Sequence, residues 1–136
     1  MDFLRALTSA ASGLRAQSGR MRIIAENLAN ADSTAQTPGG DPYRRRVPTF
    51  EQALDRETGA ATVELGRVRL DRSDFRMRYE PGHPAADENG YVRMPNVSTL
   101  VESMDMRNAQ RTYEANLNVV TATRRMIART IDILRA

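Results

Sequence analysis

The hydrophobic positions near the N-terminus repeat with the spacing of an amphipathic helix. Starting at Phe3, one stripe of residues is separated by four and three positions in strict alternation, which is typical of a coiled-coil seam. Its members are Phe3, Leu7, Ala10, Leu14, Gln17, Met21, Ile24, Leu28 and Ala31. All but Gln17 are apolar, and the intervening residues are largely polar. The pattern predicts one long helix with one apolar face, capped by Asp2 and ending between Asn30 and Asp32.

A second long helix is predicted from Ser98 or Thr99 to the end of the chain. Thr99 and Glu102 have the spacing of a capping box, in which a hydroxyl and a carboxylate bond each other's backbone N–H. The apolar stripe of this helix drifts slowly along its surface. It comprises Val101, Met104, Ala109, Thr112, Asn116, Val119, Val120, Thr123, Met126, Ile127, Thr130, Ile133 and Leu134.

The segment between the helices contains few large apolar residues and several turn signals. Pro38 to Pro42 is predicted to be a loop, and Tyr43 to Phe50 reads as extended chain. Phe50 to Arg56 is interpreted as a helical turn. Short strands are predicted at Thr62–Leu65, Val68–Leu70, Asp74–Tyr79 and Tyr91–Met94, the last two forming a pair.

These patterns together predict a mainly α fold. Its long N- and C-terminal helices pair as an antiparallel, coiled-coil-like hairpin, and a small extended or β region lies between them. The predicted organisation is an N-terminal helix at 1–32, a middle region at 33–97 and a C-terminal helix at 98–136. The two helices form one discontinuous domain.

Large side chains are scarce, because the chain has three Phe, four Tyr and no Trp. A hairpin of two helices alone therefore buries little apolar surface, and we expect its folding to be coupled to association with neighbouring chains. The residues expected to form the assembly seam are Leu7, Leu14, Met21, Ile24, Leu28, Val119, Val120, Met126, Ile127, Ile133 and Leu134.

The formal charge is +3, and all the basic side chains are arginines, because the sequence contains no lysine. Twenty arginines against seventeen acidic residues give a mixed surface. The alternative function that follows from charge is a basic helical hairpin that binds nucleic acid. Its leading residues would be Arg44, Arg45, Arg46, Arg124 and Arg125.

Little in the sequence favours catalysis. There is no cysteine, and His83 is the only histidine, in a turn between Gly82 and Pro84. A small hydrolase using His83 is a third hypothesis, but a structural loop histidine is the favoured interpretation. No glycine-rich phosphate loop occurs, and we predict no enzyme activity, no cofactor and no metal site. Neither a membrane span nor a cleaved secretory signal is expected.

Asn27 and Asn30 lie on one face at the predicted end of the first helix. Composition alone favours a frayed helix end and a turn, since asparagine tolerates left-handed backbone. The sharper alternative is a polar contact with a neighbouring chain, because each amide has both donors and an acceptor.

Several segments resemble the axial proteins of the bacterial flagellum. Ser12–Leu14 with Ile24–Asn30 is similar to the N-terminal signature that rod and hook proteins share. Other segments resemble the proximal rod proteins of the basal body, the FlgC type, over nearly the whole chain. They are Gly39–Gly40 with Pro42–Arg45, Tyr79–Pro84, Gly90–Val97 and Arg111–Asn116.

The resemblance implies a self-assembling structural subunit of the flagellar basal body, in the periplasmic rod, exported by the type III apparatus without a cleaved signal. It implies assembly into a hollow drive shaft that transmits torque and carries an export channel. The implied partners are further copies, other proximal and distal rod proteins, and basal adaptor, membrane-ring and export-gate proteins. Neither nucleic acid nor a membrane span is implied. Family-motif residues expected to make polar contacts between subunits are Asn27, Asn30, Tyr113 and Asn116.

Overall fold

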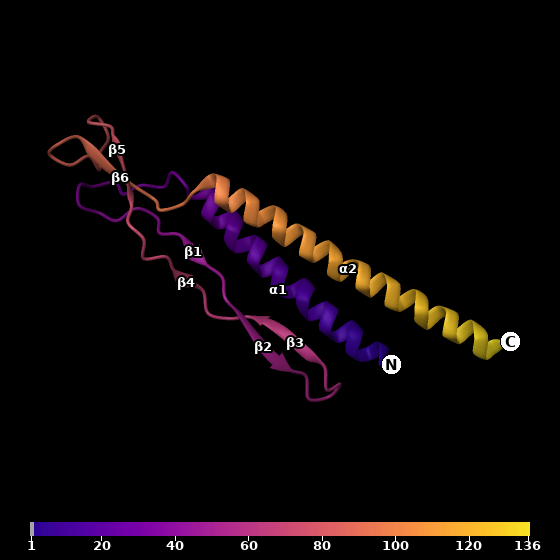
Figure 1. Cartoon of the computed structure of the whole chain (residues 1–136). Helices are drawn as coiled ribbons and strands as arrows, with labels where there is room; N and C mark the ends of the chain where they lie inside the picture. The colour runs from indigo at the N-terminus through magenta and orange to yellow at the C-terminus, as the bar shows by residue number, and fades with distance from the viewer. Residues whose placement is uncertain (1) are drawn as a thin grey trace. The chain divides into compact units, whose positions relative to one another are not determined.

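The computed structural model describes residues 2–136, and the chain divides into two compact units. Unit 1 contains residues up to 21 together with 49–67 and 107–136, and unit 2 contains 22–48 and 68–106. Each unit therefore takes a segment of both terminal helices and part of the middle region (Figure 1). The division of the chain at 32 and 97 stays a prediction.

The first helix, α1, spans Phe3–Ala29. Asp2 caps its start, because Asp2 Oδ1 accepts the backbone N–H groups of Leu4 at 3.1 Å and Arg5 at 3.3 Å. A turn follows at residues 30–32. The predicted start is confirmed, and the helix ends at Ala29, one residue before the predicted end at 30–32.

The second helix, α2, spans Thr99–Arg135. Ser98 precedes it and accepts the backbone N–H of Glu102 on its carbonyl oxygen at 2.9 Å and that of Val101 on its hydroxyl at 3.5 Å. The predicted capping box of Thr99 and Glu102 is wrong, because the Glu102 side chain turns away from the helix start and bonds Asn27 and Arg45.

Three separate antiparallel pairs make up the β structure of the described residues. These are β1 (Arg46–Val47) with β4 (Arg69–Leu70), β2 (Phe50–Leu54) with β3 (Ala61–Leu65), and β5 (Arg76–Tyr79) with β6 (Tyr91–Met94). The mainly α architecture with a small β middle region is confirmed, as is the pairing of β5 with β6.

The helical turn predicted at Phe50–Arg56 is wrong, because this segment forms β2. Its backbone pairs in full with β3, from Phe50 opposite Leu65 to Leu54 opposite Ala61. The turn at the end of β2 is closed by Asp55, whose Oδ1 accepts the N–H groups of Glu57 and Thr58. This local turn makes the hairpin possible.

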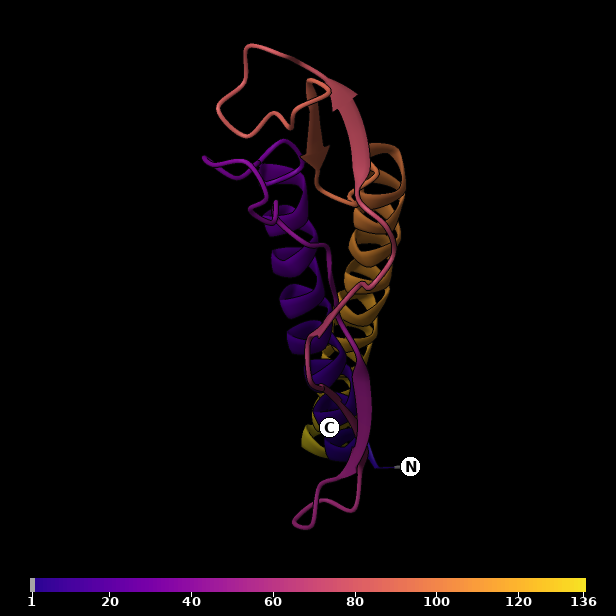
Figure 2. The same cartoon turned by 90° about the vertical axis from the view of Figure 1, so that its left-hand side faces the viewer.

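In unit 1, the β2–β3 hairpin lies along α1 (Figures 1 and 2). Ser9 Oγ donates to the carbonyl oxygen of Ala61 at 2.6 Å, and the backbone N–H of Val63 donates to Ser12 Oγ at 3.1 Å. Ser9 and Ser12 thus bond backbone groups on the edge of β3 that does not pair with β2. Among the described strands, β3 pairs with β2 alone.

A different face of α1 meets α2 in the same unit. The side chain of Asn116 lies so close to Gly13 that a Cβ at position 13 would stand 2.7 Å from its amide nitrogen. Helix α1 is therefore covered on two faces in unit 1, and its burial is wider than the single apolar stripe that the sequence predicted. Small residues permit both approaches.

In unit 2, the core combines the C-terminal part of α1 with β6 and the segment that follows it. Its buried apolar residues are Ile23, Ile24, Ala31, Val92, Met94, Pro95 and Val97.

Within residues 2–136, neither helix is apolar over a length sufficient to cross a bilayer.

We predict that Gly13→Val lowers the free energy of unfolding by about 1 to 3 kcal/mol, because the added side chain overlaps Asn116. Urea unfolding followed by circular dichroism, at a concentration where the chain is helical, measures this change. The double variant Gly13→Val with Asn116→Ala should recover much of the loss. If the second substitution restores nothing, the strain does not arise at this contact.

Candidate assembly interface

Between Ala109 and Ile133, α2 carries two neighbouring stripes, and the first of them includes the polar residues Asn116 and Thr123. One stripe is buried or half-buried and includes Ala109, Asn116, Val120, Thr123 and Ile127. The second is displaced by roughly a third of a turn, at 3.6 residues per turn, and is exposed. Its members are Ala115, Val119, Ala122, Met126 and Ile133.

The predicted seam of α2 therefore divides between these two stripes. Val120 and Ile127 belong to the covered one, whereas Val119 and Met126 belong to the exposed one. Ile133 and Leu134 near the end of the helix are 74% and 79% exposed. Within the described residues, Val120 and Ile127 take part in the packing of unit 1. The other four residues are exposed and can contact a neighbour.

The predicted seam residues of α1 are more uniformly covered. Ile24 is buried, and Leu7, Leu14, Met21 and Leu28 are half-buried. These side chains therefore contribute to packing within the chain and still present part of their surface to the outside.

Asn27 is the polar centre of unit 2, and its side chain is fully buried. Its Nδ2 donates to the carbonyl oxygen of Arg46 at 2.8 Å and to Glu102 Oε2 at 3.3 Å. Its Oδ1 accepts the hydroxyl of Tyr43 at 2.7 Å and the backbone N–H of Arg46 at 3.0 Å. An asparagine amide has two donors and two acceptor sites, and all four are used here.

This arrangement corrects the interpretation of Asn27. A frayed helix end is wrong, because the residue is fixed by four hydrogen bonds. Those bonds also leave Asn27 no capacity for a contact between subunits. Asn30 behaves differently: it is half-buried, donates to the carbonyl oxygen of Glu26 at 2.8 Å and accepts from Ser33 at 3.1 Å.

The buried carboxylate of Glu102 is the charged part of the same cluster. The Arg45 guanidinium bonds it directly and also approaches Asp71 at 3.4 Å and Asp105 at 3.7 Å. Burial by itself would lower the pKa of Arg45, but the hydrogen bonds and charges of Glu102 and Asp71 raise it above its ordinary value. Arg45 is therefore firmly cationic and compensates the buried acid.

Two other groups of unit 2 have shifted pKa values. Burial raises the pKa of Tyr43, with the positive charge of Arg46 acting in the opposite direction. The pKa of Asp71 is lowered, first by hydrogen bonds from the backbone and side chain of Ser73 and then by Arg45. The folded unit therefore favours the neutral phenol of Tyr43 and the ionised carboxylate of Asp71.

The arginine triplet 44–46 is occupied by contacts within the chain. Arg44 donates to the carbonyl oxygens of Asp71 and Ser73 and lies 4.1 Å from the ring centre of Phe75. Arg46 pairs with Glu26 at 3.4 Å. Arg44 and Arg45 therefore brace unit 2, whereas Arg46 is exposed and pairs with Glu26 at the surface.

His83 has a structural role in its loop. Its Nε2 lies 3.1 Å from the Thr34 hydroxyl, and its Nδ1 accepts the backbone N–H of Ala85 at 3.0 Å. Tyr113 and Asn116 are both half-buried on α2, and Asn116 faces Gly13.

Two family models match the ends of this sequence. Residues 7–35 match the family described as flagella basal body rod protein, and residues 88–133 match the flagellar basal body rod FlgEFG protein C-terminal family. A flagellar basal-body rod protein FlgC of Agrobacterium fabrum is 53% identical over 137 residues, covering 100% of this chain and 99% of the relative. The chain belongs to the FlgC family of flagellar basal-body rod proteins.

More distant members of the FlgC family match over nearly the same length. Those of Salmonella typhimurium and Aquifex aeolicus are each 39% identical, over 135 and 132 residues, with 98% and 97% of this chain and of the relative covered. The resemblance expected from the motifs is confirmed. The N-terminal signature residues 12–14 and 24–30 fall inside the first matched segment, and Arg111–Asn116 falls inside the second.

We predict that Asn27→Ala lowers the free energy of unfolding by about 3 kcal/mol or more, because it leaves buried partners such as Glu102 and Tyr43 unpaired. Urea unfolding at a concentration where the chain is helical measures the effect. Asn30→Ala is the matched control and should cost below about 1 kcal/mol, since its bonds are local and half-exposed. Equal losses would contradict the central role of Asn27.

Acid should weaken unit 2 through Asp71. The pKa of Asp71 is depressed in the folded state, so its stabilising effect is complete above the unfolded value of about 3.9 and is lost as the pH falls through the folded value. We predict that Asp71→Asn makes the decline of unfolding free energy below about pH 4 shallower. An unchanged slope in urea titrations from neutral to acidic pH would exclude this contribution.

Proposed function

We infer that this chain is a structural subunit of the bacterial flagellar basal-body rod and not an enzyme. The observation that carries the inference is family membership over the whole chain, with 53% identity to a basal-body rod protein and 100% of the chain covered. Two long helices, one with an exposed apolar stripe, are suited to packing against other subunits.

As a rod subunit, the chain assembles with other components of the rod in the basal body. We propose that these comprise further copies of itself and the other proximal and distal rod proteins, with basal adaptor, membrane-ring and export-gate proteins at the inner end. Export by the flagellar type III apparatus without a cleaved signal is part of the same proposal. The assembly with neighbouring subunits is supported by four exposed apolar residues of α2, which the chain itself leaves uncovered. They are Val119, Met126, Ile133 and Leu134.

We further propose that α1 and α2 pair as an antiparallel, coiled-coil-like hairpin. Gly13 meets Asn116 in unit 1, and Asn27 meets Glu102 in unit 2. Asn27 lies fourteen residues after Gly13 in α1, and Glu102 lies fourteen residues before Asn116 in α2. Two heptads of an antiparallel pair have this relation.

The nucleic-acid alternative has less support. Arg44, Arg45 and Arg46 are engaged with Asp71, Glu102 and Glu26 respectively. Of its five leading arginines, only Arg124 and Arg125 are exposed and, within residues 2–136, form no ion pair. Two arginines alone neutralise few phosphates.

Coupled folding gives a first test. We predict that the helical content of the purified chain, measured by circular dichroism, rises with protein concentration or on addition of rod partners, because neighbours supply the missing apolar burial. A chain that unfolds cooperatively with a midpoint independent of concentration would contradict this proposal.

The seam provides the second test. Leu14→Asp, Leu28→Asp and Ile127→Asp each place a charge on a half-buried helix face, and we predict that each abolishes incorporation into basal bodies and swimming motility. Gln110→Asp, on an exposed face of α2, is the matched control and should leave both intact. Normal incorporation of the three seam variants would remove the assigned role of the helices.

A further inference from the structure

The exposed stripe of α2 in unit 1 is a surface without a partner. Ala115, Val119, Ala122, Met126 and Ile133 follow one another at helical spacing over about 27 Å, at 1.5 Å per residue. Val119, Met126 and Ile133 are 47%, 41% and 74% exposed. Arg129 occupies the helical step between Met126 and Ile133, so the uninterrupted apolar part of the stripe runs from Ala115 to Met126. An exposed apolar stripe of this kind is typical of a surface that binds another protein.

Unpaired positive charge flanks this stripe. Arg107 with Arg111, and Arg125 with Arg129, are pairs of like charges separated by one helical turn, an arrangement that destabilises a helix. Within residues 2–136, none of these four arginines forms an ion pair. The partner of this face should therefore combine apolar side chains with acidic ones.

The β2–β3 hairpin of unit 1 has that chemistry. Glu51 of β2 stands directly opposite Glu64 of β3, and like charges in that position destabilise a sheet. Neither glutamate forms an ion pair within residues 2–136. Phe50 and Leu54, on the same strand as Glu51, are 42% and 67% exposed.

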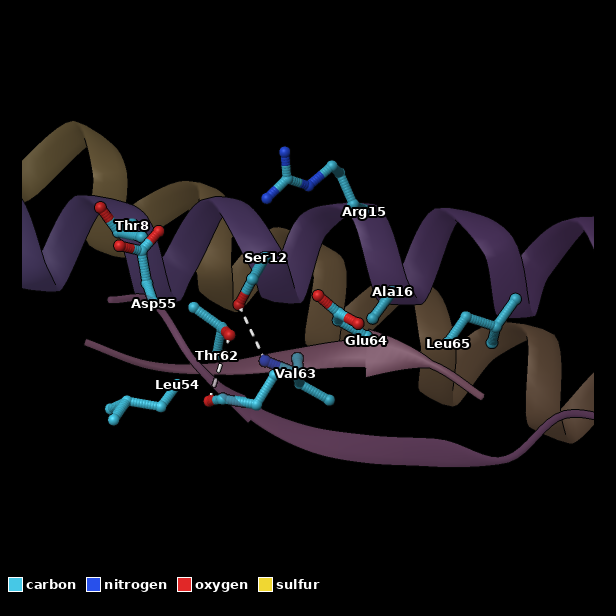
Figure 3. A pocket seen from close by; sticks show the side chains of 11 residues that line it. Thr8, Ser12, Arg15, Ala16, Leu54, Asp55, Thr62, Val63, Glu64 and Leu65 are labelled. Atoms are coloured by element: carbon cyan, nitrogen blue, oxygen red, sulfur yellow. Dashed lines mark hydrogen bonds between the residues drawn. The ribbon is translucent and has the colours of Figure 1, made fainter. Parts of the chain in front are cut away.

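The hairpin also has a free edge. Helix α1 bonds the outer edge of β3, whereas β2 pairs only with β3 among the described strands. Since side chains alternate along a strand, the outer edge of β2 presents Phe50 and Leu54 on one side and Glu51 on the other. Beside Glu64 and Asp55 lies a hollow of about 420 Å³ between α1 and the hairpin, which Arg15 of the same chain also lines (Figure 3).

We propose that the exposed stripe of α2 binds the β2–β3 hairpin of a second copy of this chain. The hairpin would place Phe50 and Leu54 against the apolar stripe and Glu51 and Glu64 near the flanking arginines. Each surface then relieves the like-charge repulsion of the other. The inference rests on the proposed rod function and names one contact between copies.

The proposed contact is heterologous, because two different surfaces of the same chain meet. Such a contact repeats from one copy to the next and generates rings or helical arrays, in contrast to a closed symmetric dimer. Every copy carries both surfaces, so no further component is needed to extend the series.

Cysteine crosslinking tests the geometry, and the chain offers a clean background because it contains no cysteine. One pool of full-length chain carries Leu54→Cys, and a second carries Val119→Cys, Met126→Cys or Ile133→Cys. Oxidation of the mixed pools, purified and in cells that assemble basal bodies, should give disulfide-linked pairs joining one copy of each kind. Absence of mixed pairs in both settings, or crosslinks joining only the α2 stripes, would overturn the proposal.

Charge reversal tests the complementarity. One variant carries Glu51→Arg with Glu64→Arg, and the other carries Arg125→Glu with Arg129→Glu. Each alone should weaken self-association by at least about tenfold in sedimentation velocity, and an equimolar mixture should restore it, because each reversed surface then finds an opposite charge. Asp74→Arg with Glu88→Arg, two exposed acids of unit 2, is the matched control and should have no effect.

The outcome separates this inference from the proposed function. If the hairpin reversal leaves association and motility unchanged while Leu14→Asp still abolishes incorporation, the hairpin contact is wrong and the rod function stands. If the unchanged chain is itself absent from purified basal bodies, the proposed function fails.

Discussion

A carboxylate that is taken out of water must be bonded and compensated, and unit 2 is organised around meeting that requirement for Glu102. This side chain is 1% exposed, and Arg45 and Asn27 both bond it. Losing either partner would leave a buried charge unsatisfied, which is far more costly than losing an exposed ion pair. Since Asn27 also bonds Tyr43 and the backbone of Arg46, one cluster fixes α1, α2 and the segment between them.

Unit 1 is held together by a different kind of contact. Ser9 and Ser12 bond the backbone of β3, and Gly13 lets the Asn116 side chain approach α1 closely. Buried residues here are small, such as Ala10, Ala16 and Ala109. Small residues bring backbones close but bury little apolar area for each contact. Apolar side chains of α2 consequently remain on the surface, where other subunits can cover them.

Local chemistry predicted much of the fold. The Asp2 cap, helical periodicity and the alternation in β5 and β6 each depend on neighbours in sequence, and the structure agrees with them. Glu102 was misassigned because its spacing from Thr99 satisfies a local rule while its actual partners are distant. In α2, the adjacent pairs Val119–Val120 and Met126–Ile127 concealed two stripes, since periodicity alone cannot tell which member of an apolar doublet faces the chain's own core. The periodicity of apolar residues in α1 gave no indication that Asn27 is buried.

The bond between Asn27 and Glu102 joins residues separated by 75 positions. A chain that ends before residue 102 lacks the acid that Asn27 and Arg45 bond. Closure of unit 2 therefore requires the start of α2 as well as the end of α1, whereas residues 107–136 belong to unit 1.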